Sequence, residues 1–328
     1  MSIINERFGN QGAAKPRKKG DAVVNAQPKS KGSKRAPVLF CVDASYSMMN
    51  MIDPEKSERT RMDLLNDMIR GFFSEILKDD CRDKVEVAFL VYSDKILMET
   101  DFARVAQLQE SDFKVRMDET YIDDYGNPNV CLKKLPSSHN EKGYLYPVFK
   151  VAEEDEGTDI GLAVLHAVNK LMKQKKALSS WGSYPATLIL VTDGNPELEA
   201  VYTLEELTRE EQEALKARRA ANQENAIKAV ADHCYTHVGQ DNLIMPFIIG
   251  IGDESFGSDL LDRYAGQLVN KAFHIRDSKA EECFEILVEV LKNSVVDSTN
   301  SNNIMQMAKE IVASAKKINR EQDPYEAI

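Results

Sequence analysis

The sequence predicts an α/β fold with a doubly wound, mostly parallel central sheet and helices on both faces of that sheet. Short apolar runs that end in polar turns predict the strands; residues 38–42 form one such run, and Asp43 ends it. The segments between these runs carry apolar residues at helical spacing. Strands that alternate with helices in this way imply a parallel sheet that is covered on both sides.

Each expected element follows from its own local pattern. Residues 59–78 place Met62, Leu65 and Ile69 on one face of an amphipathic helix. The charged segment 203–235 favours a helix that opens with a capping box at Thr203. The expected strands cover about residues 37–43, 85–92, 96–102, 186–192, 244–251 and 271–275, and the expected helices cover about 59–78, 159–175, 203–235, 257–264 and 280–294.

The same patterns divide the chain into three parts. We expect a disordered basic tail at 1–36, one domain at 37–295, and a linker with an amphipathic helix at 296–328. Within the domain, segments 103–150 and 196–225 exceed what alternating strands and helices need, so we interpret them as insertions. The apolar stripe of the C-terminal helix leaves two alternatives: it packs on its own domain, or it binds a partner.

The charge of the chain is unevenly distributed. Of 328 residues, 43% are hydrophobic and 29% charged, which is typical of a globular domain. Residues 1–36 hold nine Lys or Arg and two acids, a net +7, so the total of −11 leaves −18 on the remainder. This acidic body argues against nucleic acid as the main ligand, except for weak binding by the basic tail.

The lack of a recognisable targeting signal, together with the cysteine usage, predicts a cytoplasmic protein. No segment has the apolar length of a membrane-spanning helix, and no apolar core follows the basic residues at the start. The five cysteines are scattered, odd in number and without Cys-x-x-Cys spacing, which argues against a disulfide framework or a zinc site.

Small oxygen-bearing side chains follow the predicted strands at the points where these strands end. Asp43, Ser45 and Ser47 form a D-x-S-x-S pattern after the first strand, Asp193 follows a later strand, and Thr158 opens the helix between them. Ligands of open α/β sheets bind at the carboxyl ends of the strands. Hydroxyl and carboxylate oxygens suit a hard cation such as Mg²⁺, so we expect a cation site at this edge.

These motifs closely resemble the metal-ion-dependent adhesion site of von Willebrand factor A domains. The D-x-S-x-S strand end, the Gly157-Thr-Asp-Ile-Gly161 loop and the Thr192-Asp-Gly194 strand end occur in the family's order. The resemblance covers about residues 36–295 and implies a Rossmann-like fold. One departure is Tyr46, where the family usually has Gly; it should alter access to the ion without altering its ligation.

The resemblance also implies the role of each residue. Ser45 and Ser47 would bind Mg²⁺ or Mn²⁺ directly, Thr158 and Asp193 directly or through water, and Asp43 mostly through water. An ion with few charged protein ligands keeps an open position for a carboxylate from outside. The implied function is a divalent-metal-dependent protein–protein interaction module whose protein partner supplies an acidic residue.

The family's intracellular bacterial members suggest a role in a stress-response or defence system of the tellurium-resistance type, with a kinase, a phosphatase or an AAA+ ATPase as partner. Two alternatives are an adaptor subunit of an AAA+ ATPase complex and a metal-dependent phosphohydrolase. Against the latter, Ser45 stands where an aspartyl-phosphate phosphatase needs a second Asp, and no phosphate-binding loop occurs. We therefore expect a protein that is not an enzyme.

Each candidate residue also has a simpler explanation when it is taken alone. Ser45 and Ser47 could be helix caps, Thr158 an N-cap and Asp193 a turn former. For the neighbouring Asp159 we favour a helix cap over a metal ligand.

Overall fold

The structure is a computed structural model of the chain. It describes residues 34–52, 58–76, 80–109, 136–139, 145–152, 157–178, 184–193, 208–234, 244–253, 259–265, 272–281 and 313–320, with shorter pieces at 112, 121–122 and 128–129 and between 283 and 295. The chain separates into units 1–32 and 33–328, and the description below concerns the second unit. Most of the predicted basic tail lies outside the described residues.

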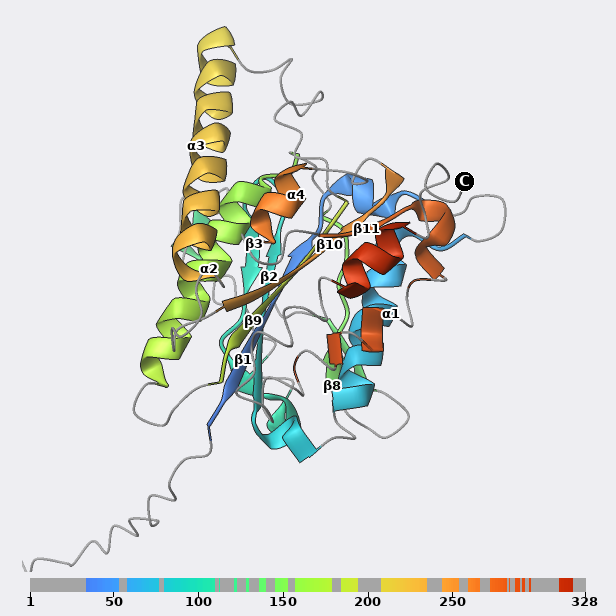
Figure 1. Cartoon of the computed structure of the whole chain (residues 1–328). Helices are drawn as coiled ribbons and strands as arrows, with labels where there is room; N and C mark the ends of the chain where they lie inside the picture. The colour runs from blue at the N-terminus through green and yellow to red at the C-terminus, as the bar shows by residue number, and fades with distance from the viewer. Residues whose placement is uncertain are drawn as a thin grey trace, which may run out of the picture. The chain divides into compact units, whose positions relative to one another are not determined.

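A seven-stranded mixed sheet forms the centre of this unit (Figure 1). Its order is β11-β10-β9-β1-β2-β3, with β4 also paired to β2, and every pairing from β11 to β2 is parallel. Non-consecutive neighbours such as β9 and β1 show that the chain crosses over between strands. The strands are β1 (Ala36–Asp43), β2 (Val85–Tyr92), β3 (Ile96–Glu99), β4 (Ala103–Arg104), β9 (Ala186–Thr192), β10 (Ile244–Ile251) and β11 (Phe273–Ile275).

The predicted fold class is wrong in its account of the sheet. Strands β3 and β4 both run antiparallel to β2, so the sheet is mixed rather than a doubly wound Rossmann-like sheet. Residues 93–95 are all that separate β2 from β3. A parallel return needs a crossover of a dozen or more residues, whereas a turn this short permits only a hairpin.

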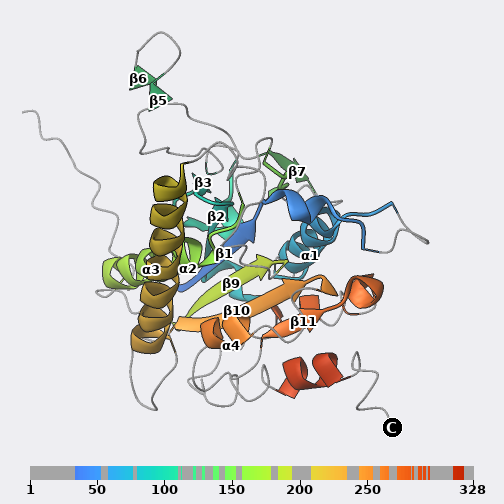
Figure 2. The ribbon, with the colours of Figure 1, turned by 90° about the horizontal axis from the view of Figure 1, so that it is seen from above.

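The larger helices cover the two faces of the sheet. Figures 1 and 2 show α1 on one face and α2, with α3 outside it, on the other. The labelled helices are α1 (Arg61–Ile76), α2 (Ile160–Ala177), α3 (Arg209–His233) and α4 (Asp259–Tyr264). Among the described helices, none combines the length and the apolar character that crossing a membrane requires.

Aromatic side chains join α1 to the sheet. Phe40 of β1 lies between Phe72 of α1 and Phe89 of β2, with ring centroids 5.2 and 5.5 Å apart. All three rings are buried, and aromatic pairs at this separation stabilise a core beyond their buried area. The apolar residues at helical spacing in the sequence thus form the face of α1 that packs on the sheet.

Helix α3 packs against α2 rather than against the sheet. It is charged throughout, and its buried side chains are Arg219, Ala226 and Val230. Its N-cap is Thr208, which forms a reciprocal capping box with Glu211. The capping box predicted at Thr203 lies outside the described residues, and the described helix begins later than that prediction.

The predicted insertion at 103–150 contains short elements where it is described. They are η3 (Val105–Gln107), β5 (Tyr121–Ile122), β6 (Pro128–Asn129), β7 (Ser137–His139) and β8 (Leu145–Pro147), with β5–β6 and β7–β8 paired as two-stranded sheets. Its last residues join the core, because the side chain of Asn66 holds the backbone of Phe149 through bonds of 2.7 and 3.0 Å.

The C-terminal helix, described at 313–320, packs on its own domain. Ala315 and Ile318 are buried in the main core. The Asn319 side chain donates to the carbonyl of Ala272 at 3.0 Å and accepts from the backbone nitrogen of His274 at 2.9 Å. Because these groups belong to edge strand β11 and the residue before it, the amide completes the edge in place of another strand. The structure thus selects the first alternative.

Candidate cation site

Three segments meet at the carboxyl edge of β1, β2 and β9. Oγ1 of Thr192 donates to Oδ2 of Asp43 at 2.7 Å and ties the end of β9 to the end of β1. The backbone nitrogen of Ala44 donates to the carbonyl of Tyr92 at 2.8 Å and ties β1 to β2. Asp43 is fully buried at the centre of this junction.

The two serines lie side by side after β1. Their Oγ atoms are 3.0 Å apart. Ser45 occupies the N-cap position of η1 (Tyr46–Met49), but its side chain makes no capping hydrogen bond. Its backbone nitrogen instead donates to Oδ1 of Asp43 at 2.9 Å. The simpler explanation of Ser45 as a helix cap therefore does not hold.

Thr158 is buried in the loop before α2. The N-cap of that helix is Asp159, whose side chain accepts from the backbone nitrogen of Leu162 at 2.9 Å, which confirms the predicted cap. The backbone nitrogen of Asp159 donates to the carbonyl of Ser93, just beyond β2, at 2.8 Å. This bond holds the Thr158 loop at the same sheet edge. Thr158 is therefore not the N-cap of α2, because Asp159 occupies that position.

Asp193 is buried at the end of β9 and faces a charge that sequence reasoning missed. Nη1 of Arg61 lies 3.5 Å from Oδ2 of Asp193, and both side chains are 3% exposed. One signal was available: Arg61 follows Thr60 at the start of a helix, where a cation opposes the helix dipole and needs an acidic partner.

Tyr92 and Cys41, two buried groups near Asp43, both have raised pKa values. Burial, followed by the charge of Asp43, raises the pKa of the Tyr92 hydroxyl well above its ordinary value. Burial and Asp43, in the same order, raise the pKa of the Cys41 thiol. Both groups therefore stay neutral, and Asp43 is the main anion near them.

The donor set fits a hard cation better than it fits a catalytic nucleophile. Two hydroxyls, a buried threonine and two carboxylates supply only oxygen, as Mg²⁺ and Mn²⁺ prefer. Among the residues that the structure describes, no three His, Cys, Asp or Glu side chains gather as metal ligands, so a cation here would depend on the hydroxyls. Asp43 already accepts hydrogen bonds on both oxygens, which holds it in place as a supporting ligand.

Three exposed apolar side chains lie close to the serines in the sequence. Tyr46, Met49 and Met51 are 62, 49 and 50% exposed, and they are the large hydrophobic side chains that stand out to solvent within the described part of the chain. Tyr46 lies between Ser45 and Ser47 in the sequence. We call these three residues the apolar rim.

Comparisons with known proteins give weak likenesses. No family model and no curated protein matches the sequence. Among solved structures, the chain is similar to the PilB minor pilin from Streptococcus sanguinis, at 12% identity and a TM-score of 0.42, over 81% of this chain and 63% of that one. A point mutant of that pilin gives 13% identity and a TM-score of 0.47, over 83% and 64%. The chain thus spans less than two thirds of either pilin structure.

Two further neighbours are a pilus adhesin and a thread matrix protein. The pilus adhesin SpaC from Lactobacillus rhamnosus GG matches at 12% identity and a TM-score of 0.41, over 86% of this chain and 31% of that one. Proximal thread matrix protein 1 from the mussel byssus matches at 14% identity and a TM-score of 0.38, over 80% and 49%. At these TM-scores the likenesses carry no argument about what this chain binds.

These comparisons contradict the predicted family. The matched structures are named as pilins and pilus adhesins, and no von Willebrand factor A model matches. Membership of that family and the intracellular stress-response function, with its tellurium-resistance and AAA+ versions, are corrected accordingly. Short strand-end motifs of small polar residues recur on many folds, so they establish neither. The label of metal-ion-dependent adhesion site is withdrawn with the family, while the five candidate residues stay a prediction.

The predicted cytoplasmic localisation is withdrawn as well, since solved structures similar to this chain are named as pilins and a pilus adhesin. The inference used the missing patterns of a membrane-spanning helix and a secretory signal together with the cysteine usage, and these features do not determine the compartment in which a folded domain works. The prediction that the protein is not an enzyme stays a prediction.

Proposed function

We propose that the sheet-edge cluster binds a divalent cation, Mg²⁺ or Mn²⁺, and that this chain is a non-enzymatic binding domain. Asp43, Ser45, Ser47, Thr158 and Asp193 would hold the ion. The observation that carries the proposal is the pair of serine hydroxyls 3.0 Å apart, of which Ser45 occupies a cap position without capping. Oxygen atoms at this separation can share one small cation.

Hydrogen bonds within the cluster support this assignment. Asp43 receives bonds from Ser45 and Thr192, so its carboxylate is held in place before any ion arrives. Of the two carboxylates in the set, Asp193 already faces the charge of Arg61, so the neutral hydroxyls and Asp43 would leave part of the charge of the cation uncompensated. An acidic group from a ligand would therefore complete the coordination.

The partner we propose is a protein segment that carries an acidic residue beside an apolar one. The exposed side chains of the apolar rim, Tyr46, Met49 and Met51, are next to the serines in the sequence and would offer contact to such a neighbour. The body of this chain is acidic, so an acidic partner would be repelled without the cation. The same reasoning argues against nucleic acid as the partner.

The first test measures cation binding by the double variant Ser45→Ala with Ser47→Ala. Wild-type protein should bind Mn²⁺ with one site by calorimetry, and Mg²⁺ should compete. The double variant should lose this binding, yet melt in EDTA near the wild-type temperature, because the serine side chains bond chiefly to each other. Ser138→Ala, on β7 of a separate two-stranded sheet, is the matched control. Equal Mn²⁺ affinity in the double variant and the wild type would reject the site.

The second test addresses the partner. A displayed library of random peptides is selected on the wild-type chain in Mg²⁺ and eluted with EDTA. Enrichment of Asp or Glu beside an apolar residue, lost with Tyr46→Ser, supports the proposed ligand. Enrichment of basic peptides, or selection that persists in EDTA, contradicts it.

A further inference from the structure

Arg61 links the candidate site to an acid outside it. Its guanidinium forms a two-pronged ion pair with Asp277 of η6 (Asp277–Lys279), with Nε 2.9 Å from Oδ1 and Nη2 2.6 Å from Oδ2. Its third nitrogen, Nη1, lies 3.5 Å from Oδ2 of Asp193. One positive charge is therefore shared between a candidate cation ligand and a carboxylate that belongs to another element.

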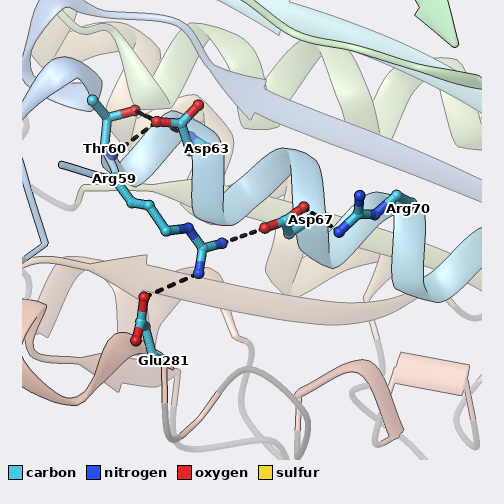
Figure 3. Close-up of polar contacts among 6 residues, drawn as sticks. All are labelled: Arg59, Thr60, Asp63, Asp67, Arg70 and Glu281. Carbon is cyan, nitrogen blue, oxygen red and sulfur yellow. Dashed lines mark hydrogen bonds and ion pairs between the residues drawn. The ribbon is translucent and has the colours of Figure 1, made fainter. Parts of the chain in front are cut away.

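The backbone around Arg61 holds the guanidinium in this position. Thr60 and Asp63 form a capping box at the start of α1, which makes Arg61 its first residue (Figure 3). A Cβ on Gly252 would lie 2.6 Å from Cζ of Arg61, so only glycine fits against the guanidinium there. Gly252 also has a φ of 116°, which a side chain would strain.

The electrostatics of this position are unusual. A cation in the first turn of a helix faces the positive end of the helix dipole, and burial of its side chain adds a cost of desolvation. Arg61 bears both disadvantages, at 3% exposure. The buried carboxylate of Asp193 and the partly exposed carboxylate of Asp277 compensate for them, and an arginine stays charged at every accessible pH.

We propose that Arg61 is the internal counter-ion of the cation site: it neutralises Asp193 while the site is empty and thereby keeps cation affinity low. This inference rests on the proposed function. A divalent ion at Asp193 must compete with the guanidinium for the same carboxylate. The fold then does not depend on the cation, because the buried Asp193 always has a positive neighbour.

Two substitutions should shift affinity in opposite directions. Arg61→Gln removes the competing charge and leaves the buried carboxylate of Asp193 without its cationic neighbour, so the affinity for Mn²⁺ should rise by about tenfold or more. Asp277→Asn removes the carboxylate that competes with Asp193 for the guanidinium. Arg61 should then interact more strongly with Asp193, and the affinity for Mn²⁺ should fall severalfold. A merely structural role for Arg61 would weaken binding in both variants.

The experiment is Mn²⁺ titration of the full chain by calorimetry, with melting temperatures in EDTA and in excess Mg²⁺. Arg59→Gln is the matched control, because Arg59 lies two residues away and pairs with Asp67 and Glu281 (Figure 3). In EDTA, Arg61→Gln should melt below the wild type, and Mg²⁺ should raise its melting temperature by more than it raises that of the wild type. Should Arg61→Gln not fold alone, Arg61→Gln with Asp277→Asn removes the ion pair without changing the net charge and should also bind Mn²⁺ more tightly than the wild type.

The outcomes separate the two proposals. Affinity in the order Arg61→Gln, wild type, Asp277→Asn supports the counter-ion. If the wild type binds Mn²⁺ through Ser45 and Ser47 but Arg61→Gln binds no more tightly, the counter-ion is rejected and the site stands. If no variant binds Mn²⁺, the site is rejected and the counter-ion with it.

Discussion

Gly161 of α2 touches the backbone of Gln223 of α3: a Cβ built on Gly161 would lie 2.6 Å from the Gln223 nitrogen. The two helices therefore approach one another backbone to backbone at this position. The contact explains how α3, which has little apolar surface of its own, covers α2. It lies directly after the Thr158 loop, so the packing of α3 bears on the candidate site.

Gly161→Ala should destabilise the protein despite the higher helix propensity of alanine. Propensity alone favours alanine by about 1 kcal/mol. The added Cβ would meet backbone atoms that cannot rotate away, and such overpacking costs about 1–3 kcal/mol, so the net change should be a loss of stability. Urea unfolding at pH 7 measures it. An unchanged or higher midpoint would show that α3 moves aside without cost.

Thr192→Val should lower the free energy of unfolding by about 2 kcal/mol, because it removes a hydrogen bond to the buried carboxylate of Asp43. Valine keeps the shape and the strand preference of threonine. Urea midpoints compare this variant with Thr187→Val, a second buried threonine of β9. A similar loss in the two variants would mean that the bond to Asp43 is not its cause.

Glu99 should make stability depend on pH in the acid range. Hydrogen bonds from His166 and Lys170 of α2 lower the pKa of Glu99 to about 2 from an ordinary 4.5. A carboxyl with a depressed pKa contributes stability that is present above the unfolded pKa and lost as pH falls through the folded pKa. The disadvantage of Glu99→Gln should therefore be constant above about pH 5 and vanish between pH 4.5 and 2.

Urea unfolding of Glu99→Gln across that pH range checks this expectation. Glu213→Gln is the control, since the ion pair between Arg209 and Glu213 is exposed and should contribute little at any pH. A disadvantage of Glu99→Gln that persists at pH 2 would indicate that packing, not charge, is what the substitution removes.

Asn319→Ala should reduce the protection of the backbone at edge strand β11. The substitution removes the side chain that bonds to Ala272 and His274, so hydrogen exchange at the His274 amide should speed up by tenfold or so, the equivalent of one modest hydrogen bond. Lys316→Ala, on the exposed side of the same helix, should leave the exchange unchanged. Unchanged exchange in Asn319→Ala would mean that the helix shields the edge without this amide.

Several features of the fold could be predicted from local sequence because their causes are local. The apolar runs identify β1, β2, β9 and β10, since a buried strand must be apolar along its whole length. The polar residues that end these runs then fall at one sheet edge. Asp159 could be predicted as a cap because a cap bonds within its own turn.

Other features could not be predicted because they join residues far apart in the chain. Arg61 contacts Asp277 and Asp193, and Asn319 contacts β11, and no local pattern marks such pairs. The direction of β3 was missed although the short turn after β2 would have indicated it.

The sequence by itself determined the main buried strands and the larger helices and where the polar ends of those strands lie, because those outcomes follow from the burial and hydrogen bonding of neighbouring residues. Only the tertiary structure decided that the sheet is mixed, that the C-terminal helix closes its edge, and that a buried arginine stands beside Asp193. These features depend on charges and backbone groups that come together only when distant segments pack.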